Sequence, residues 1–125
     1  MNNFNGIIVT TDLDRNLIET VFQGSITRAE IEQYETDIAA ALALVRAEFI
    51  LFSDLTPLES MAQDCIPHIE RVMDNLRKGG IGRIVRVIPH PSKDIGLSIM
   101  SLFHYPRGLP IVTCQTRDEA ERALH

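Results

Sequence analysis

Hydrophobic and polar positions follow two different periods that alternate along the chain. The segments Gly6–Thr11 and Leu17–Gln23 are rich in β-branched residues, and a turn-forming Asp-Leu-Asp-Arg-Asn stretch separates them. This arrangement predicts an antiparallel hairpin, which we expect to end at Gly24 and Ser25.

A helical period replaces the strand pattern after the hairpin. Thr27 and Glu30 have the spacing of a capping box, in which each side chain bonds the backbone N–H of the other residue. Apolar residues then recur every three or four positions and predict a helix to about Arg46. The residues of this stripe are Ile31, Tyr34, Ile38, Leu42 and Val45.

The middle of the chain contains a strand, a connection and a second helix. Phe49–Ser53 is an unbroken apolar run, which is typical of a strand covered on both faces. The stretch Asp54–Gln63 has no clean period, and long connections of this kind often carry function. We expect Asp64 to cap the second helix and Gly79 to end it. Its apolar stripe contains Ile66, Ile69, Met73 and Leu76.

The last third repeats the alternation of strand and helix. It predicts a strand at Ile84–Ile88, a helix from Ser92 through Phe103, a strand at Pro110–Cys114 and a helix at Arg117–Leu124. The order is therefore β-β-α-β-α-β-α-β-α. This order predicts an α/β fold with a mixed, mostly parallel sheet that begins with a hairpin.

Composition narrows the possible classes of protein. A chain of 125 residues that is 45% hydrophobic and 23% charged predicts one globular domain over residues 1–125. A net charge of −5 opposes binding to nucleic-acid phosphates. The sequence has no transmembrane run and no export signal, so we expect a cytoplasmic protein with reduced Cys65 and Cys114.

The predicted order resembles the STAS domain of sulfate-transporter tails and anti-sigma-factor antagonists. The residues that carry the resemblance are the hairpin, the Gly-Ser-Ile-Thr entry at 24–27 and the Phe-Ile-Leu-Phe-Ser-Asp-Leu-Thr run at 49–56. The chain is similar to sporulation antagonists and to SEC14-type lipid-binding domains. The resemblance implies a non-enzymatic regulatory module, without a cofactor, that binds a protein partner or itself. The alternative that it implies is a carrier of a small apolar ligand or lipid.

One position departs from the pattern of the family. In phosphorylated antagonists, a Ser follows an Asp at the start of the second helix, and a kinase modifies that Ser. The corresponding pair here is Asp64 and Cys65, and a thiol is not the ordinary substrate of a serine kinase. Thr56 and Ser60 are nearby hydroxyls, but neither occupies the matching position.

The start of the second helix also carries a candidate nucleophile. A helix N-terminus lowers the pKa of a thiol, and His68 follows Cys65 by three residues, so a thiol-dependent enzyme is a further alternative. The competing interpretation is a capping Asp64, a small buried thiol and a surface imidazole. The four histidines lack the spacing of a metal site.

Two further groups are candidates for binding. His90 and Ser92 follow a predicted strand and, with Asp54 and Thr56, are expected at the carboxyl edge of the sheet, where α/β proteins bind ligands. Arg86 lies within an apolar strand. By alternation it shares a face with Ile84 and Ile88, so that face is either a partner interface or contains an ion pair.

Overall fold

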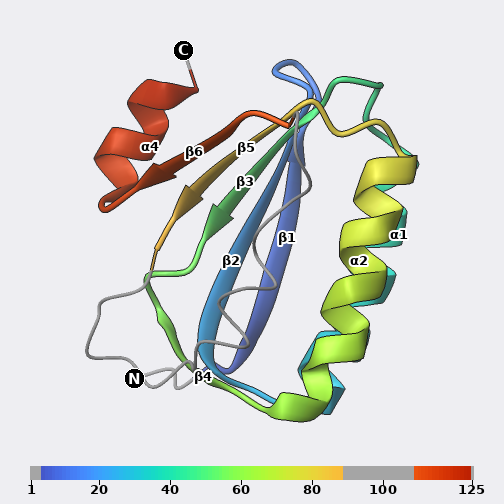
Figure 1. Ribbon diagram of the computed structural model, residues 1–125, viewed down its shortest axis with the longest axis vertical. Helices are drawn as coiled ribbons and strands as arrows, with labels where there is room; N and C mark the ends of the chain where they lie inside the picture. Colours follow the sequence, from blue (N-terminus) through green and yellow to red (C-terminus); the bar gives the residue numbers. More distant parts are fainter. Residues whose placement is uncertain (1–3, 89–108, 125) are drawn as a thin grey trace.

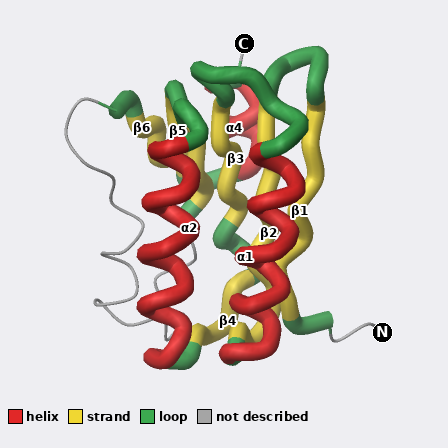
Figure 2. The backbone as a smooth tube through the Cα atoms, turned by 90° about the vertical axis from the view of Figure 1, so that its right-hand side faces the viewer, coloured by secondary structure: helices red, strands yellow, loops and turns green. Residues whose placement is uncertain are grey.

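The computed structural model describes residues 4–88 and 109–124. Within these ranges a sheet lies between two layers of helices, as Figures 1 and 2 show. The helices are α1 (Arg28–Leu42), α2 (Ile66–Lys78) and α4 (Arg117–Ala123), with a short 3-10 turn η1 (Gln63–Cys65) before α2. The strands are β1 (Gly6–Asp12), β2 (Leu17–Ile26), β3 (Ile50–Asp54), β4 (Leu58–Met61), β5 (Arg83–Val87) and β6 (Ile111–Cys114).

The sheet of the described residues has the order β1-β2-β3-β5-β6, and β4 pairs with the far end of β2. β1 and β2 form an antiparallel hairpin, whereas β2, β3, β5 and β6 are mutually parallel. The predicted mixed, mostly parallel sheet is therefore confirmed. The helix predicted from Ser92 through Phe103, together with His90 and Ser92, lies outside the described residues.

Alternation along the central strand β3 assigns its side chains to two cores. Leu51 packs under α1 and α2, while Phe52 packs on the opposite face, which α4 covers. Thr20 and Ser53 are buried on the first face, and their hydroxyl oxygens hydrogen-bond each other at 2.9 Å. This bond satisfies two polar groups that would otherwise be costly to bury.

Helix α1 begins as predicted and ends earlier than predicted. The capping box of Thr27 and Glu30 is present, and the Thr27 backbone N–H donates to the Glu30 carboxylate at 2.8 Å. The helix ends at Leu42, so the predicted extension to Arg46 is wrong. The Asn16 side chain, from the hairpin turn, accepts from the Arg46 N–H at 2.8 Å and donates to the Arg46 carbonyl at 3.1 Å. These long-range bonds hold the backbone at Arg46 outside the helix.

The boundaries at the other end of the sheet also differ from the prediction. β2 does not end at Gln23 but continues to Ile26. Gly24 lies at an irregularity with φ 69°, and an added Cβ would approach the Asn5 carboxamide oxygen to 2.0 Å. Glycine is therefore required where the strand leaves β1 and pairs with β4.

Candidate functional site

The carboxyl ends of the parallel strands meet at the end of the molecule where α1 and α2 begin, at the bottom of Figure 1. Asp54 ends β3, and Thr56 follows it in the connection to β4. Asp64 and Cys65 lie in the 3-10 turn that leads into α2. The parallel pairing therefore brings these predicted candidates to one edge of the sheet.

Strand β4 is a feature that the sequence pattern missed, because it lies within the stretch expected to be aperiodic. Ser60 pairs in register with Ser25, and the Ser60 hydroxyl donates to the Ser25 hydroxyl at 3.0 Å. The strand continues to Met61, and the Ala62 N–H then donates to the carbonyl of Ile26 at 2.9 Å. The only signal in the sequence was the pair of apolar residues, Leu58 and Met61, on either side of two polar residues. That pattern is too short to distinguish a strand from a loop.

The pairing of β4 with β2 brings the end of β2 beside the turn that leads into α2. We call this the carboxyl-edge surface and define it by Ser25, Thr27, Gln63 and Asp64, which are all exposed. The backbone bonds between β2 and β4 and the turn before α2 support it from beneath.

Cys65 lies beneath this surface and does not form part of it. Its side chain is fully buried, and the thiol points to the carbonyl of Ile26, with an Sγ–O distance of 3.7 Å. Burial, and secondarily the charge of Asp64, raises the pKa of the Cys65 thiol to about 11. The expectation of a lowered pKa is therefore wrong, because desolvation outweighs the effect of the helix N-terminus.

The start of α2 also differs from the prediction in its cap. Asp64 does not cap the helix: the N-cap is Cys65, without a side-chain bond, after the 3-10 turn. Pro67 occupies the first turn as expected, where its missing N–H costs little.

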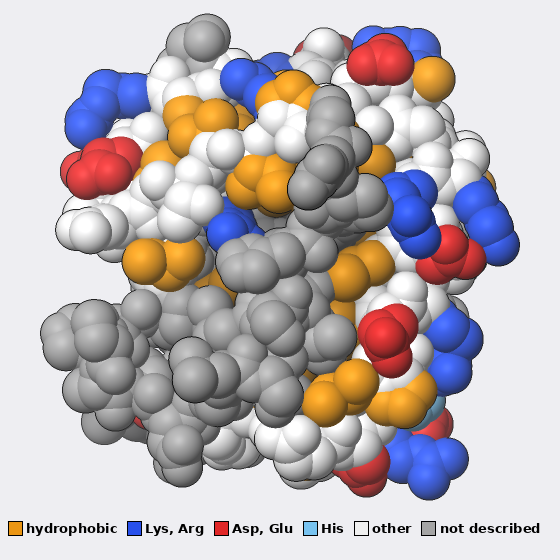
Figure 3. Space-filling model, in the orientation of Figure 1, with side chains coloured by type: hydrophobic (Ala, Val, Ile, Leu, Met, Phe, Trp, Pro, Cys, Tyr) orange, Lys and Arg blue, Asp and Glu red, His pale blue; other side chains and the backbone are white. Residues whose placement is uncertain are grey.

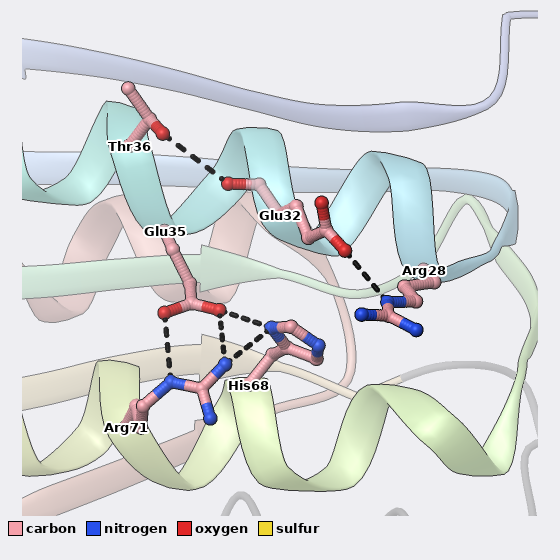
Figure 4. Close-up of polar contacts among 6 residues, drawn as sticks. All are labelled: Arg28, Glu32, Glu35, Thr36, His68 and Arg71. Carbon is pink, nitrogen blue, oxygen red and sulfur yellow. Dashed lines mark hydrogen bonds and ion pairs between the residues drawn. The ribbon is translucent and has the colours of Figure 1, made fainter.

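His68 joins an ion cluster between α1 and α2, drawn in Figure 4. Its Nδ1 contacts the carboxylate of Glu35 on α1. Arg71 donates to both oxygens of the same carboxylate, at 3.1 Å from Nε and 2.9 Å from Nη2. Arg71, and secondarily His68, holds the pKa of Glu35 below its ordinary value. His68 is therefore engaged in linking α1 to α2, while the Cys65 thiol contacts the carbonyl of Ile26.

Asp54 and Thr56 hold the loop after β3. One Asp54 oxygen accepts from the Thr56 backbone N–H at 3.0 Å and from its hydroxyl at 2.6 Å. The other accepts from Arg117 of α4 at 3.2 Å, and Arg117 also donates to Glu19 at 2.5 Å. The guanidinium lies 5.0 Å from the centre of the Phe52 ring. Arg117 was missed because its partners lie 63 and 98 residues away, and no local spacing indicates such a contact.

The Arg86 face of β5, predicted to be a partner interface or to contain an ion pair, is covered in part by the protein itself, so Ile84 is wrong as an interface residue. Ile84 is buried under α1 and α2, while Ile88 lies just after the strand and is partly buried. The Arg86 Nε donates to the Thr113 hydroxyl at 2.9 Å. Arg86 and Ser53 line a small cavity of about 20 Å³. That volume holds about one water molecule, whereas ligand pockets occupy several hundred Å³.

Residues 4–88 and 109–124 contain no group of His, Cys, Asp and Glu side chains placed to hold a metal ion. None of their helices combines the length and apolar character needed to cross a bilayer.

Three solved structures resemble this chain over almost its whole length. A DUF3478-family protein with a SpoIIAA-like fold from Shewanella loihica aligns with a TM-score of 0.71 and 15% identity, covering 100% of this chain and 98% of its own. The anti-sigma factor antagonist SpoIIAA, in its unphosphorylated form, gives 0.64 and 16%, with 95% and 97% covered. An anti-sigma factor antagonist from Mycobacterium paratuberculosis gives 0.57 and 20%, with 95% and 94% covered.

These likenesses confirm the predicted STAS-like fold. No family model matches the sequence, and no curated protein matches it. The similarity therefore establishes the arrangement of strands and helices, and function has to be argued from the site.

Proposed function

We propose that this chain is a non-catalytic domain that binds a protein partner through the carboxyl-edge surface. The pairing of β4 with β2 carries the proposal, because it holds the exposed end of β2 and the exposed turn before α2 in a fixed arrangement before any partner arrives. Such preorganisation reduces the entropy lost on association. Two proteins with the same fold are named as antagonists of anti-sigma factors, which supports binding to another protein as the function.

Charge indicates the kind of partner that this surface fits. Asp64 is exposed on it, and the whole chain carries a net charge of −5. A partner with basic residues at its contact face would be attracted before contact and oriented by the complementary potential.

The buried thiol at the start of α2 bears on how binding would be controlled. Cys65 has no hydroxyl to phosphorylate and no exposed surface. The Thr56 hydroxyl already donates to Asp54, and a phosphate there would add roughly two negative charges beside that carboxylate. We therefore propose that the partner is bound without a kinase acting at either residue. Of the hydroxyls predicted as candidates and described by the structure, only Ser60 then remains for such a modification.

The experiment is to identify the partner by cross-linking and affinity capture from the source cells, and then to titrate the purified pair by calorimetry. The variant Ser25→Arg with Asp64→Arg places two bulky cations on the carboxyl-edge surface. We expect it to weaken binding at least about tenfold, equivalent to about 1.4 kcal/mol.

The matched control is Asp14→Arg, the same exchange in the exposed β1–β2 turn at the opposite end of the molecule. It should bind the partner as tightly as the unmodified chain. Equal binding by the surface variant, or equal weakening by the control, would refute the assignment of the surface. Intact-mass measurement of protein from the source cells would contradict the proposed control if it located a phosphate on Thr56.

A further inference from the structure

The outer edge of the sheet at β1 lacks the features that normally prevent strands from pairing. β1 bonds to β2 on one side, and no other strand of the described residues pairs with it. It forms the margin of the sheet in Figure 2. Its sequence from Ile7 to Thr11 is Ile-Ile-Val-Thr-Thr, without Lys, Pro or any charge. Edge strands are usually protected by such residues, because their free N–H and C=O groups otherwise template a new strand.

The exposed large apolar side chains of the described residues gather around the same strand. Phe4 precedes β1 and is 52% exposed, Ile8 lies within it at 41%, and Leu13 follows it at 45%. Leu44, at 58%, lines an open groove of about 310 Å³ between α1 and β1. The exposed side of α2, by contrast, carries interspersed acidic and basic side chains, seen at the right of Figure 3. Exposed apolar groups thus lie along the length of this free strand edge, whereas the exposed side of α2 is charged.

The strand is complementary to a second copy of itself. Antiparallel pairing about a two-fold axis at Val9 places Ile8 opposite Thr10 of the second copy, and Ile7 opposite its Thr11. All of these residues are β-branched, and such pairs pack well across strands. The same register places Leu13 of each copy opposite Asn5 of the other, one position from Phe4, so that apolar groups approach each other at both ends.

The charge of the β1 edge and its exposed apolar area are both compatible with a second copy of the chain. The uncharged run from Ile7 to Thr11 places no like charges opposite each other, and Asp12 at the strand end is already paired with Arg15 at 2.8 Å. The four exposed apolar side chains offer on the order of 400 Å² per copy, about half of what a standard interface buries per partner. The strand backbone and the groove supply further area, so we expect a weak dimer.

We propose that two copies of this chain pair antiparallel along β1, forming one continuous sheet. This surface is distinct from the carboxyl-edge surface, so the dimer does not depend on the proposed function. The proposal also explains how an edge strand without charge is kept from non-specific pairing, since self-pairing closes it.

Sedimentation velocity across a wide range of concentrations tests the proposal. The unmodified chain should change reversibly from monomer to dimer. The variant Ile8→Lys with Thr10→Lys places cations opposite cations across the two-fold axis, and we expect it to remain monomeric. The variant Ile8→Glu with Thr10→Glu should also remain monomeric. An equimolar mixture of the two should form a heterodimer, because Lys then faces Glu.

The matched control is Ala39→Lys, an added cation at an exposed position of α1, and it should dimerise like the unmodified chain. Circular dichroism checks that every variant keeps the native fold. A monomer at all concentrations for the unmodified chain would overturn the proposal. A dimer that persists in the Lys variant, or a mixture that stays monomeric, would overturn it as well.

Discussion

The two faces of the sheet are stabilised in different ways. The face under α1 and α2 has an extensive apolar core, in which Phe22 packs edge-on against Tyr34 with ring centroids 5.3 Å apart. The face under α4 has a smaller cluster around Phe52, and one cation, Arg117, links it to Asp54 and Glu19. Both helical layers pack on the same sheet. The layer of α1 and α2 is held by buried apolar surface, whereas α4 is held mainly by the hydrogen bonds and ion pairs of Arg117.

This difference indicates which substitutions should lower the free energy of unfolding on each face of the sheet. Apolar packing contributes in proportion to the area removed from water and depends little on the charges around it. A short helix of seven residues buries little area, so a few polar contacts decide whether it stays docked. We therefore expect core substitutions to have the largest effect on the first face and charge substitutions to have selective effects on the second.

The largest expected effect is that of Phe22→Ala. The ring is 1% exposed and fills the core between the sheet and α1, so its removal should lower the free energy of unfolding by about 3–5 kcal/mol. Val112→Ala, at a partly buried position of the α4 face, is the control and should cost about 1 kcal/mol. Urea denaturation followed by circular dichroism measures both. If Phe22→Ala lowered the free energy of unfolding less than Val112→Ala, the proposed difference between the two faces would be wrong.

The next effect is that of Arg117→Met, which keeps an apolar stem over Phe52 but removes the cation. Asp54 and Glu19 are then left without their shared donor, and we expect a loss of about 1–2 kcal/mol in unfolding experiments. Adding Asp54→Asn should recover part of that loss, which a double-mutant cycle measures. Arg122→Met on the exposed side of the same helix should change stability by less than about 0.5 kcal/mol. Additive losses in the cycle would show that Arg117 and Asp54 are not coupled.

The two cysteines provide a reporter for each face. Burial raises the pKa of both thiols, that of Cys65 to about 11, so alkylation requires local opening of the structure. We expect iodoacetamide to label Cys114 at least about tenfold faster than Cys65, because the α4 layer opens at a lower free energy. Peptide mapping by mass spectrometry during labelling measures the two rates. Faster labelling of Cys65 would reverse the proposed order of stability.

The smallest effect concerns pH and the cluster between α1 and α2. Arg71 and His68 hold the pKa of Glu35 below its ordinary value, so this contact stabilises the fold above the pKa of an unfolded carboxyl. That contribution is lost as the pH falls through the lowered pKa. Because the cluster is partly exposed, Glu35→Gln should cost less than about 1 kcal/mol near neutral pH.

Urea denaturation over a range of acidic pH values tests this effect. The difference between Glu35→Gln and the unmodified chain should shrink toward acid pH, while Glu70→Gln, at an exposed position of α2, should show a small difference that does not vary with pH. A constant difference for Glu35→Gln would show that the ionised carboxylate contributes nothing.

The sequence predicted the features that short-range patterns encode. The hairpin, the capping box at Thr27 and the apolar stripe of α1 each depend on residues a few positions apart, and they are confirmed. The end of α1 was missed because Asn16, from the hairpin turn, holds the backbone at Arg46. β4 was missed because four residues are too few to show a period when their partner strand is far away in the sequence.

The candidate site also combines features that the sequence predicted with features that it did not. Its position at the carboxyl edge was predictable, because parallel strands must end together once helices connect them. The state of Cys65 was not, since the same Asp-Cys pair is compatible with an exposed thiol or with one buried against Ile26. Likewise, the sequence contains Glu35, His68 and Arg71, but only the packing of α1 against α2 brings them together.

The amino-acid sequence alone thus determined the class of fold, the order of its elements and the edge where candidate residues gather. Local hydrogen bonding and hydrophobic period act over a few residues, so they can be recognised without coordinates. The tertiary structure alone decided which side chains are buried, which ions meet and which strand edge has no neighbour among the described residues. Those properties depend on distances between residues that are remote in the chain, and only the packed fold sets them.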